Sequence, residues 1–185
     1  MAFCVVYDAC VLYPAMLRDL LLRLAEAELV RARWSEEILD ECVAAILKNR
    51  PDLTAESLER TKALMATVVP DCLVLNYESL VSSLELPDPD DRHVLAAAIR
   101  CGAQAIVTFN KRDFPLEALA PFGIETKHPD DFVVETIDLA PAAVARIVDE
   151  LQRALMNPPM SREGVWGALE KAGLVQSVAR LRELR

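Results

Sequence analysis

The sequence predicts an α/β fold, in which a mostly parallel central sheet lies between two layers of helices and is followed by an all-helical extension. Short apolar runs, such as FCVVY at 3–7 and AIVTF at 105–109, alternate with longer segments whose apolar residues recur at helical spacing. Strands separated by helices form βαβ units, which build parallel sheets covered on both faces. After His128 only helical patterns occur. We therefore expect one domain over residues 1–131 and a helical extension over 132–185.

Each element follows from a local pattern. Buried parallel strands are short and continuously apolar, and this pattern predicts strands at 3–7, 72–75, 105–109 and 124–126. Helical spacing between capping and breaking residues predicts helices at 15–30, 36–48, 54–68, 90–101, 142–155, 162–173 and 174–184. Ser35 and Ser161 are the expected N-caps, and Gly102 ends the helix before the third strand.

Composition excludes several classes of protein. A chain of 185 residues that is 53% apolar and 26% charged is globular and not disordered. The longest stretch without a charged side chain, 101–110, is too short to span a bilayer, and the run at 3–7 is too short for a signal peptide. Five cysteines without a CxxC pair indicate reduced core thiols rather than disulfides or zinc ligands. A cytoplasmic protein is expected.

The net charge of −9 argues against nonspecific electrostatic binding of nucleic acid phosphates. Residues 132–185 hold seven acidic and seven basic side chains, so the excess lies in residues 1–131. Binding of a polyanion must therefore be local or assisted by a metal ion. Ordinary surface acidity that keeps the protein in solution is the simpler explanation of the charge.

Four acidic side chains are predicted to meet at one edge of the sheet. Asp8 ends the first strand, and Asn110 and Asp113 follow the third. Glu41 lies in an otherwise apolar helical run and is expected to face the stripe that packs on the sheet, while Asp91 opens a helix. Ligands of open parallel sheets bind outside the carboxyl ends of the strands. Taken singly, each acid also fits a turn, a cap, a loop or a solvated surface.

Such a cluster needs a compensating cation. Unpaired carboxylates about 4 Å apart repel by roughly 4 kcal/mol at an effective dielectric constant of 20. Mg²⁺ and Mn²⁺ prefer carboxylate oxygens, water and substrate phosphates as ligands. The four acids therefore indicate a site for Mg²⁺ (or Mn²⁺) suited to phosphodiester hydrolysis.

Four segments resemble, in order and spacing, the acidic motifs of PIN-domain nucleases, and most closely those of VapC-type toxins of type II toxin-antitoxin systems. They are VYDAC at 6–10, WSEEILDE at 34–41, DPDDRHVLAAA at 88–98 and VTFNKRDFP at 107–115. The C-terminal helices resemble an extension found in a subgroup of these toxins. The resemblance implies a three-layer α/β/α fold, a Mg²⁺- or Mn²⁺-dependent endoribonuclease, frequent homodimers and a cognate antitoxin protein encoded nearby.

The resemblance also assigns residues. Asp8, Glu41, Asp91 and Asp113 match the metal-binding acids, and Thr108 and Asn110 match polar residues that line the site. Many relatives have aspartate where this chain has Asn110, a departure that bears on a second metal position.

Other residues have two interpretations. Arg92, Lys111 and Arg112 are close in sequence to the acids and either hold RNA phosphates or form a solvated surface. His93, near the start of a helix, either faces the site or is a packing or surface residue, and the second interpretation is favoured. Trp34 is assigned to packing.

Two other functions fit parts of the pattern. A phosphatase with an aspartyl nucleophile would need a second aspartate two residues after Asp8, where this chain has Cys10. A PIN-like domain without catalysis, which binds RNA or another protein, agrees with the acidic charge and with Asn110. The presence of all four acids in this chain favours the nuclease.

Overall fold

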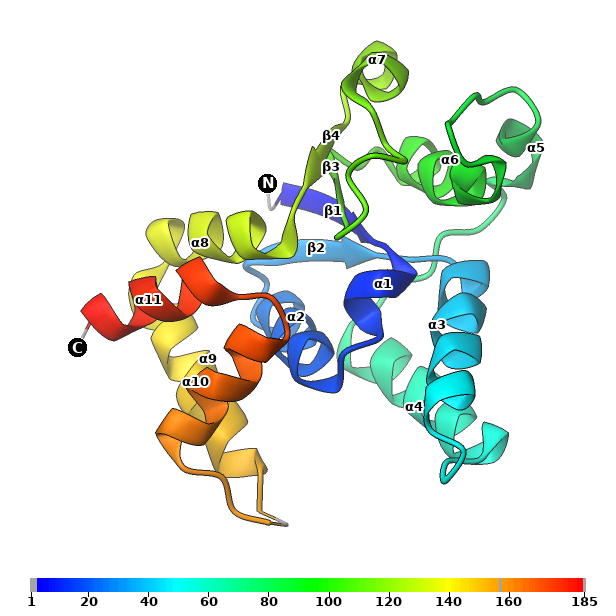
Figure 1. The fold of residues 1–185 in the computed structure, drawn as a ribbon. Coiled ribbons are helices and arrows are strands. Elements are labelled where there is room, and N and C mark those ends of the chain that lie inside the picture. The colour runs from blue at the N-terminus through cyan, green and yellow to red at the C-terminus, as the bar shows by residue number, and fades with distance from the viewer. Residues whose placement is uncertain (1–2, 157, 185) are drawn as a thin grey trace.

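The computed structural model describes residues 3–156 and 158–184. Its centre is a four-stranded sheet in the order β2-β1-β3-β4, and every neighbouring pair of strands is parallel (Figure 1). The strands are β1 (Phe3–Tyr7), β2 (Val30–Arg33), β3 (Ala105–Val107) and β4 (Glu125–Lys127). The parallel sheet predicted from the sequence is confirmed.

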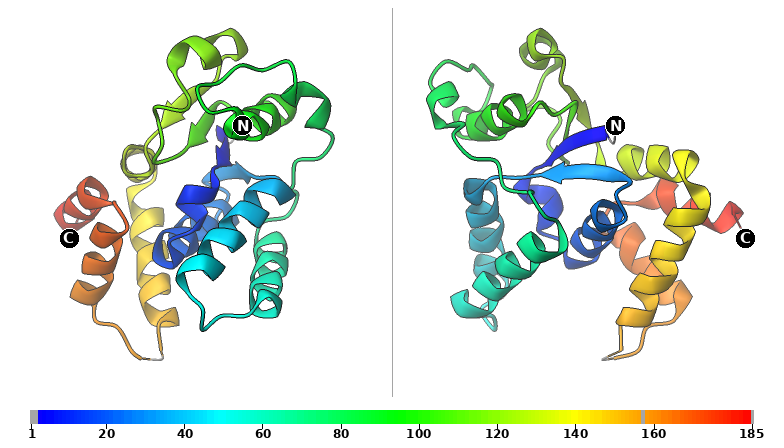
Figure 2. Two further views of the ribbon diagram at one scale, coloured as in Figure 1. Left: turned by 45° about the vertical axis from the view of Figure 1, so that its right-hand side comes forward. Right: turned by 180° about the vertical axis from the view of Figure 1, so that it is seen from behind.

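Helices cover both faces of this sheet. Around the sheet lie α1 (Ala9–Leu12), α2 (Ala15–Glu26), α3 (Glu36–Asn49), α4 (Ala55–Val68), α5 (Glu78–Val81), the 3-10 turn η1 (Pro89–Asp91), α6 (Arg92–Cys101), α7 (Leu116–Leu119) and the 3-10 turn η2 (Ala120–Phe122). After β4 follow α8 (Pro129–Leu139), α9 (Pro141–Ala154), α10 (Arg162–Lys171) and α11 (Val175–Glu183). Helices α5 and α6 lie on one side of the sheet and α1 to α4 on the other, so the three-layer α/β/α fold is confirmed (Figures 1 and 2).

Two element predictions were wrong. The helix expected over 15–30 ends at Glu26, and the chain then forms the edge strand β2. The sequence VRAR hides this strand because Val30 and Ala32 face the core while Arg31 is exposed, so no continuous apolar run exists. The segment 72–75, predicted as a strand, pairs with the rest of the sheet only at a single bridge to Trp34.

Aromatic side chains fill the core beneath the strand that carries the candidate site. Tyr7, the last residue of β1, is fully buried and stacks on Trp34 at a centroid distance of 6.3 Å. The ring of Phe132 in α8 meets Tyr7 edge-on at 6.1 Å. Trp34 is itself fully buried, as expected for a packing residue. These contacts fix the end of β1, and with it the next residue, Asp8.

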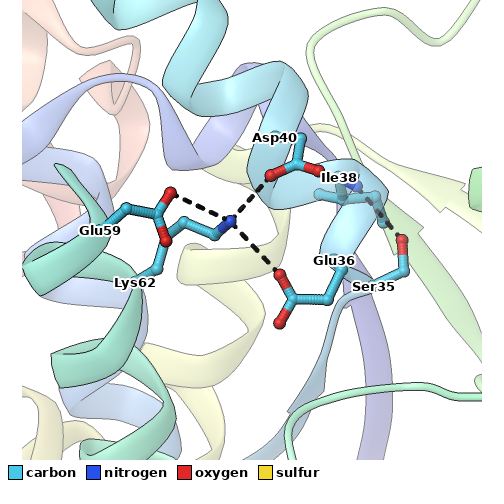
Figure 3. Close-up of polar contacts among 6 residues, drawn as sticks. All are labelled: Ser35, Glu36, Ile38, Asp40, Glu59 and Lys62. Atoms are coloured by element: carbon cyan, nitrogen blue, oxygen red, sulfur yellow. Dashed lines mark hydrogen bonds and ion pairs between the residues drawn. The ribbon is translucent and has the colours of Figure 1, made fainter. Parts of the chain in front are cut away.

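Helix α3 is fixed at its start and along its outer face (Figure 3). The Ser35 hydroxyl accepts a hydrogen bond from the Ile38 backbone N–H at 3.2 Å, which confirms Ser35 as the N-cap. On α4, the Lys62 ammonium lies 2.7 Å from Asp40 and 3.3 Å from Glu36, so it joins the two helices. This support matters because α3 carries Glu41.

A buried hydrogen-bond cluster joins the first and last helices of the C-terminal region. The Asp130 carboxylate, at the start of α8, accepts bonds from the Gln176 and Ser177 backbone N–H groups, both at 2.8 Å, and from the Ser177 hydroxyl at 2.6 Å. Ser161 caps α10 as predicted. Over residues 3–156 and 158–184, no helix combines the length and the apolar character needed to cross a membrane.

Candidate active site at the carboxyl ends of the strands

Asp8 occupies the centre of the candidate site because it follows β1, one of the two central strands. Its side chain is buried, and its Oδ2 atom accepts hydrogen bonds from the Thr108 hydroxyl at 2.6 Å and the Cys10 thiol at 3.0 Å. Its backbone N–H donates to the Val107 carbonyl at 3.1 Å, which ties the ends of β1 and β3 together. Both side-chain partners are neutral, and among the described residues no Lys, Arg or His forms an ion pair with this buried carboxylate.

Asn110 and Asp113 form the second part of the site, in the loop after β3. The Asn110 backbone N–H donates to the Thr108 hydroxyl at 2.9 Å, and its side-chain amide donates to the Asp113 carboxylate. A backbone bond from Asp113 N–H to the Asn110 carbonyl closes the turn. Thr108 therefore accepts from this loop and donates to Asp8, so one hydroxyl links both strand ends.

Asp91 shows that the four acids share one electrostatic environment. Burial raises the pKa of Asp91 to about 6, and the negative charges of Asp8, Asp113, Asp88 and Glu41 contribute to the rise in that order. Asp91 ends η1 directly before α6, and the residues one and two turns along its stripe are buried, as predicted. The charges of the other three predicted acids thus act on Asp91, together with burial, which is the larger cause, and with the charge of Asp88.

The position of Glu41 corrects one expectation. Its side chain is 43% exposed and does not face the apolar stripe, which the buried residues Ile38 and Cys42 form instead. It reaches across to α6, where its Oε1 lies 2.9 Å from the His93 Nε2. Burial lowers the pKa of His93, but the hydrogen bond and the charge of Glu41, with the charges of Glu37 and Asp8, raise it above its usual value overall.

Three basic residues lie near the acids in sequence. Lys111 and Arg112 are exposed, and Arg92 is half-buried with a buried Nε that has no hydrogen-bond partner among the described residues. Within residues 3–156 and 158–184, none of the three forms an ion pair with a carboxylate. Their charges are therefore available to another anion.

Two neighbours of the acids were not among the predicted site residues. Cys10 was assigned to the core with the other cysteines, but it donates to Asp8 and accepts from the Phe109 backbone N–H at 3.3 Å. Burial and the charge of Asp8 raise the pKa of its thiol to about 12, so it stays a donor. For His93 a place at the site was the less favoured of two interpretations, and its buried ring bonds Glu41. Its place two residues after Asp91 was the available signal.

The chemistry of the donor set fits a hard divalent cation. Carboxylate oxygens predominate, the nearest hydrogen-bond donors to Asp8 are neutral, and mutual repulsion contributes to the raised pKa of Asp91. Among the residues that the structure describes, no three His, Cys, Asp or Glu side chains are already gathered closely enough to hold one ion. Asp8 and the loop of Asn110 and Asp113 lie at the carboxyl ends of β1 and β3, and the acidic side chains would have to close together around a bound cation.

Comparisons with known proteins match the two regions of the chain separately. A family model described as PIN domain matches residues 4–112, and one described as VapC50 C-terminal domain matches residues 129–183. The protein named "Putative ribonuclease VapC50" of Mycobacterium tuberculosis (strain ATCC 25618 / H37Rv) is 42% identical over 79 residues. The alignment covers 43% of this chain and 47% of that relative, so the chain spans about half of its length. No solved structure matches significantly.

These matches confirm the resemblance drawn from the acidic motifs. The PIN-domain model covers more than half of the 185 residues and includes Asp8, Glu41 and Asp91. The second model covers α8 to α11, which include the C-terminal helices that the sequence placed in a subgroup with an extension, whereas α8 itself was not predicted. A parallel sheet with acids at its carboxyl edge, helices on both faces and these two matches lead to one conclusion: the chain belongs to the PIN-domain family.

Proposed function

We propose that the protein is a metal-dependent endoribonuclease that hydrolyses RNA phosphodiester bonds at the edge carrying Asp8, Glu41, Asp91 and Asp113. The observation that carries the proposal is the buried Asp8 carboxylate at the end of β1, whose side-chain hydrogen-bond partners are the neutral Thr108 and Cys10. The negative charges of Asp8, Asp113 and Glu41 add to the effect of burial in raising the pKa of Asp91, and such charges are costly unless a ligand offsets them. The name of the relative, a ribonuclease, supports RNA as the substrate.

The four acids are the proposed ligands of Mg²⁺ or Mn²⁺. When bound, such an ion supplies Lewis-acid activation of water and neutralises charge on the phosphate. Thr108 holds Asp8 in place through its hydroxyl, and Asn110 does the same for Asp113 through its amide. These neutral donors orient carboxylates without competing as cations, as groups behind metal ligands commonly do.

Arg92, Lys111 and Arg112 are the proposed contacts to the RNA backbone. All three lack an ion-pair partner within the described part of the chain, and all are close in sequence to a proposed ligand or to Asn110. Contacts to phosphate position a strand without reading its sequence. A few local cations of this kind reconcile binding of RNA with a net charge of −9.

The proposed biological role is that of the toxin of a toxin-antitoxin pair. The support is the family membership, the matched C-terminal model and the name of the relative. A cognate antitoxin encoded nearby, homodimerisation and a cytoplasmic location belong to the same proposal. Induced expression should arrest growth, and co-expression of the neighbouring gene should restore it. Growth unaffected by the wild-type protein would contradict the toxin role.

Cleavage of total cellular RNA tests the enzymatic proposal. Wild type, Asp8→Asn and the control Asp40→Asn are compared with Mg²⁺, with Mn²⁺ and with EDTA. Asp40 is adjacent to Glu41 but is exposed on the outer face of α3, where it binds Lys62. Discrete products that need metal, appear with Asp40→Asn and disappear with Asp8→Asn support the site. Equal cleavage by Asp8→Asn would refute it.

A second candidate is a PIN-like module that binds RNA or a protein without cutting. Asn110, where many relatives have aspartate, favours it, and so does the lack of a preformed three-ligand group among the described residues. Titration calorimetry separates the two functions. The nuclease should bind Mn²⁺, whereas the module should bind RNA equally well with and without metal and leave it intact.

A further inference from the structure

The turn that ends α10 lies against the ring of Phe109, the residue between Thr108 and Asn110. Gly173 in this turn has a φ of +96°, and a Cβ atom there would lie 2.8 Å from Cε1 and 3.3 Å from Cζ of Phe109. No Cβ atom is accommodated at such a distance without a shift of the ring. The close approach therefore requires glycine at 173 both for its backbone conformation and for its lack of a side chain.

Phe109 has a second contact at the start of α8. The rings of Phe109 and His128 meet edge-on, with centroids 5.2 Å apart and planes inclined at 74°. His128 is also the N-cap of α8, because its Nδ1 accepts from the Asp130 backbone N–H at 3.2 Å. These two contacts of the Phe109 ring, which also packs against the hydrophobic core, come from the region that the C-terminal family model covers or directly adjoins.

These two contacts belong to one rigid unit. Asp130, two residues after His128, binds the backbone of Gln176 and Ser177, which lie just after Gly173. The Asp130 carboxylate is buried and makes three charge-assisted bonds to this segment, which are stronger than neutral ones. The Gly173 turn therefore cannot move relative to His128 without breaking the cluster.

The neighbours of Phe109 both touch proposed ligands. Thr108 donates to Asp8 at 2.6 Å, and Asn110 bonds Asp113 through its side-chain amide. The Phe109 backbone N–H donates to the Cys10 sulfur at 3.3 Å, and a thiol sulfur is a weak acceptor. The backbone here is also held by the Thr108 N–H, which donates to the Lys127 carbonyl at 3.0 Å, so the Phe109 ring is an additional anchor between the two contacts.

We infer that the C-terminal extension positions the nuclease site. Gly173 and His128 hold the Phe109 ring in place, so that Thr108 hydrogen-bonds Asp8 and Asn110 hydrogen-bonds Asp113. This inference rests on the proposed function for its catalytic consequence. Gly173, His128 and Phe109 are positioning residues, since none of them touches the substrate in this scheme. A displacement of reacting groups by about 1 Å can cost about 100-fold in rate.

Gly173→Ala directly tests the contact between the Gly173 turn and the Phe109 ring. The new methyl group displaces the Phe109 ring, and we expect kcat for RNA cleavage to fall about 10- to 100-fold. In a Phe109→Leu background the atoms that clash are missing, so the same substitution should cost less than about threefold there. Gly102→Ala is the matched control, because Gly102 also has a positive φ of 65° but has open space where a Cβ atom would lie.

His128→Asn tests the second contact while preserving the helix cap. The asparagine oxygen replaces the ring nitrogen as acceptor for the Asp130 N–H, so α8 should keep its start. The ring contact to Phe109 is lost, and kcat should fall while the melting temperature stays near that of wild type. If His128 had only a structural role, the substitution would lower the melting temperature, and kcat measured at temperatures well below the melting temperature would stay unchanged.

Amide NMR spectra supply a readout that does not need activity. In Gly173→Ala and His128→Asn, the backbone amides of residues 108–113 and the Asn110 side-chain amide should shift, and in Gly102→Ala they should not. If wild type fails to cut RNA, the proposed function fails and these shifts alone decide the inference. Unchanged resonances with unchanged kcat in Gly173→Ala, or shifts no larger than in Gly102→Ala, would overturn it.

Discussion

Replacing Asp91 with asparagine should stabilise the metal-free protein at neutral pH and abolish its activity. Burial and the neighbouring acids raise the pKa of Asp91 from 3.8 to about 6. Between about pH 4 and pH 6, Asp91 is therefore still protonated in most of the native state but already deprotonated in most of the unfolded chain. By linkage, the charged Asp91 side chain lowers the free energy of unfolding as the pH rises through this window, and its cost is fully present above pH 6.

The magnitude follows from the size of the pKa shift. A shift of about two units corresponds to about 3 kcal/mol at about 1.4 kcal/mol per unit, if no solvent screening is applied. Asp91 is only partly buried, so screening reduces the effect, and we expect about 1 kcal/mol. For a chain of this size that gain raises the melting temperature by about 2–4 °C at pH 7.5.

Thermal unfolding in EDTA measures the effect, with Asp90→Asn as the control. Asp90 carries the same charge one residue earlier but is exposed. The advantage of Asp91→Asn should be roughly halved at pH 5, where part of the wild-type population holds the proton, and absent below about pH 4. A lower melting temperature for Asp91→Asn at pH 7.5, or a gain that does not depend on pH, would refute the repulsion among the four acids.

Other predictions concern the supports of the site. Lys62→Met removes the cation between α3 and α4 and should cost about 0.5–1 kcal/mol in urea unfolding, less in high salt; an unchanged midpoint would contradict this. Asp130→Asn leaves buried backbone donors without a full set of acceptors and should cost about 1–3 kcal/mol, whereas exposed Asp131→Asn should cost almost nothing. A double-mutant cycle of His93→Gln and Glu41→Gln should show a coupling of about 1 kcal/mol in the free energy of unfolding at pH 6 and none by pH 9. The raised pKa of His93 means that its bond to Glu41 gives stability that is lost as the ring deprotonates. Equal coupling at both pH values would exclude an ion pair.

The sheet and the position of Asp8 at the end of a central strand could be predicted because they depend on local patterns. The run 3–7 is apolar on both faces, as a central parallel strand must be, and Asp8 follows it directly. β2 could not be predicted in this way, because an edge strand exposes alternate residues such as Arg31 and loses the continuous run. The strand prediction for 72–75 failed for the opposite reason. This segment is apolar and partly buried, but it pairs with the sheet only at Trp34.

The partners of the acids depend on tertiary contacts that no local pattern encodes. Glu41 meets His93 only because α3 and α6 approach each other, 52 residues apart in the chain. Helical periodicity placed Glu41 on the wrong face, since one residue of rotation separates it from the buried Cys42. The contact of Gly173 with Phe109 likewise follows from how the Asp130 cluster docks α11 on α8.

The central claim is that Asp8, Glu41, Asp91 and Asp113 together bind divalent metal. Electron paramagnetic resonance of Mn²⁺ tests it most directly, with titrations of wild type, Asp8→Asn, Asp91→Asn and the exposed control Asp90→Asn under identical conditions. The account predicts binding by wild type and Asp90→Asn, and at least about tenfold weaker binding by each of the other two variants. Wild-type affinity in both Asp8→Asn and Asp91→Asn, or no Mn²⁺ binding by the wild type, would contradict it.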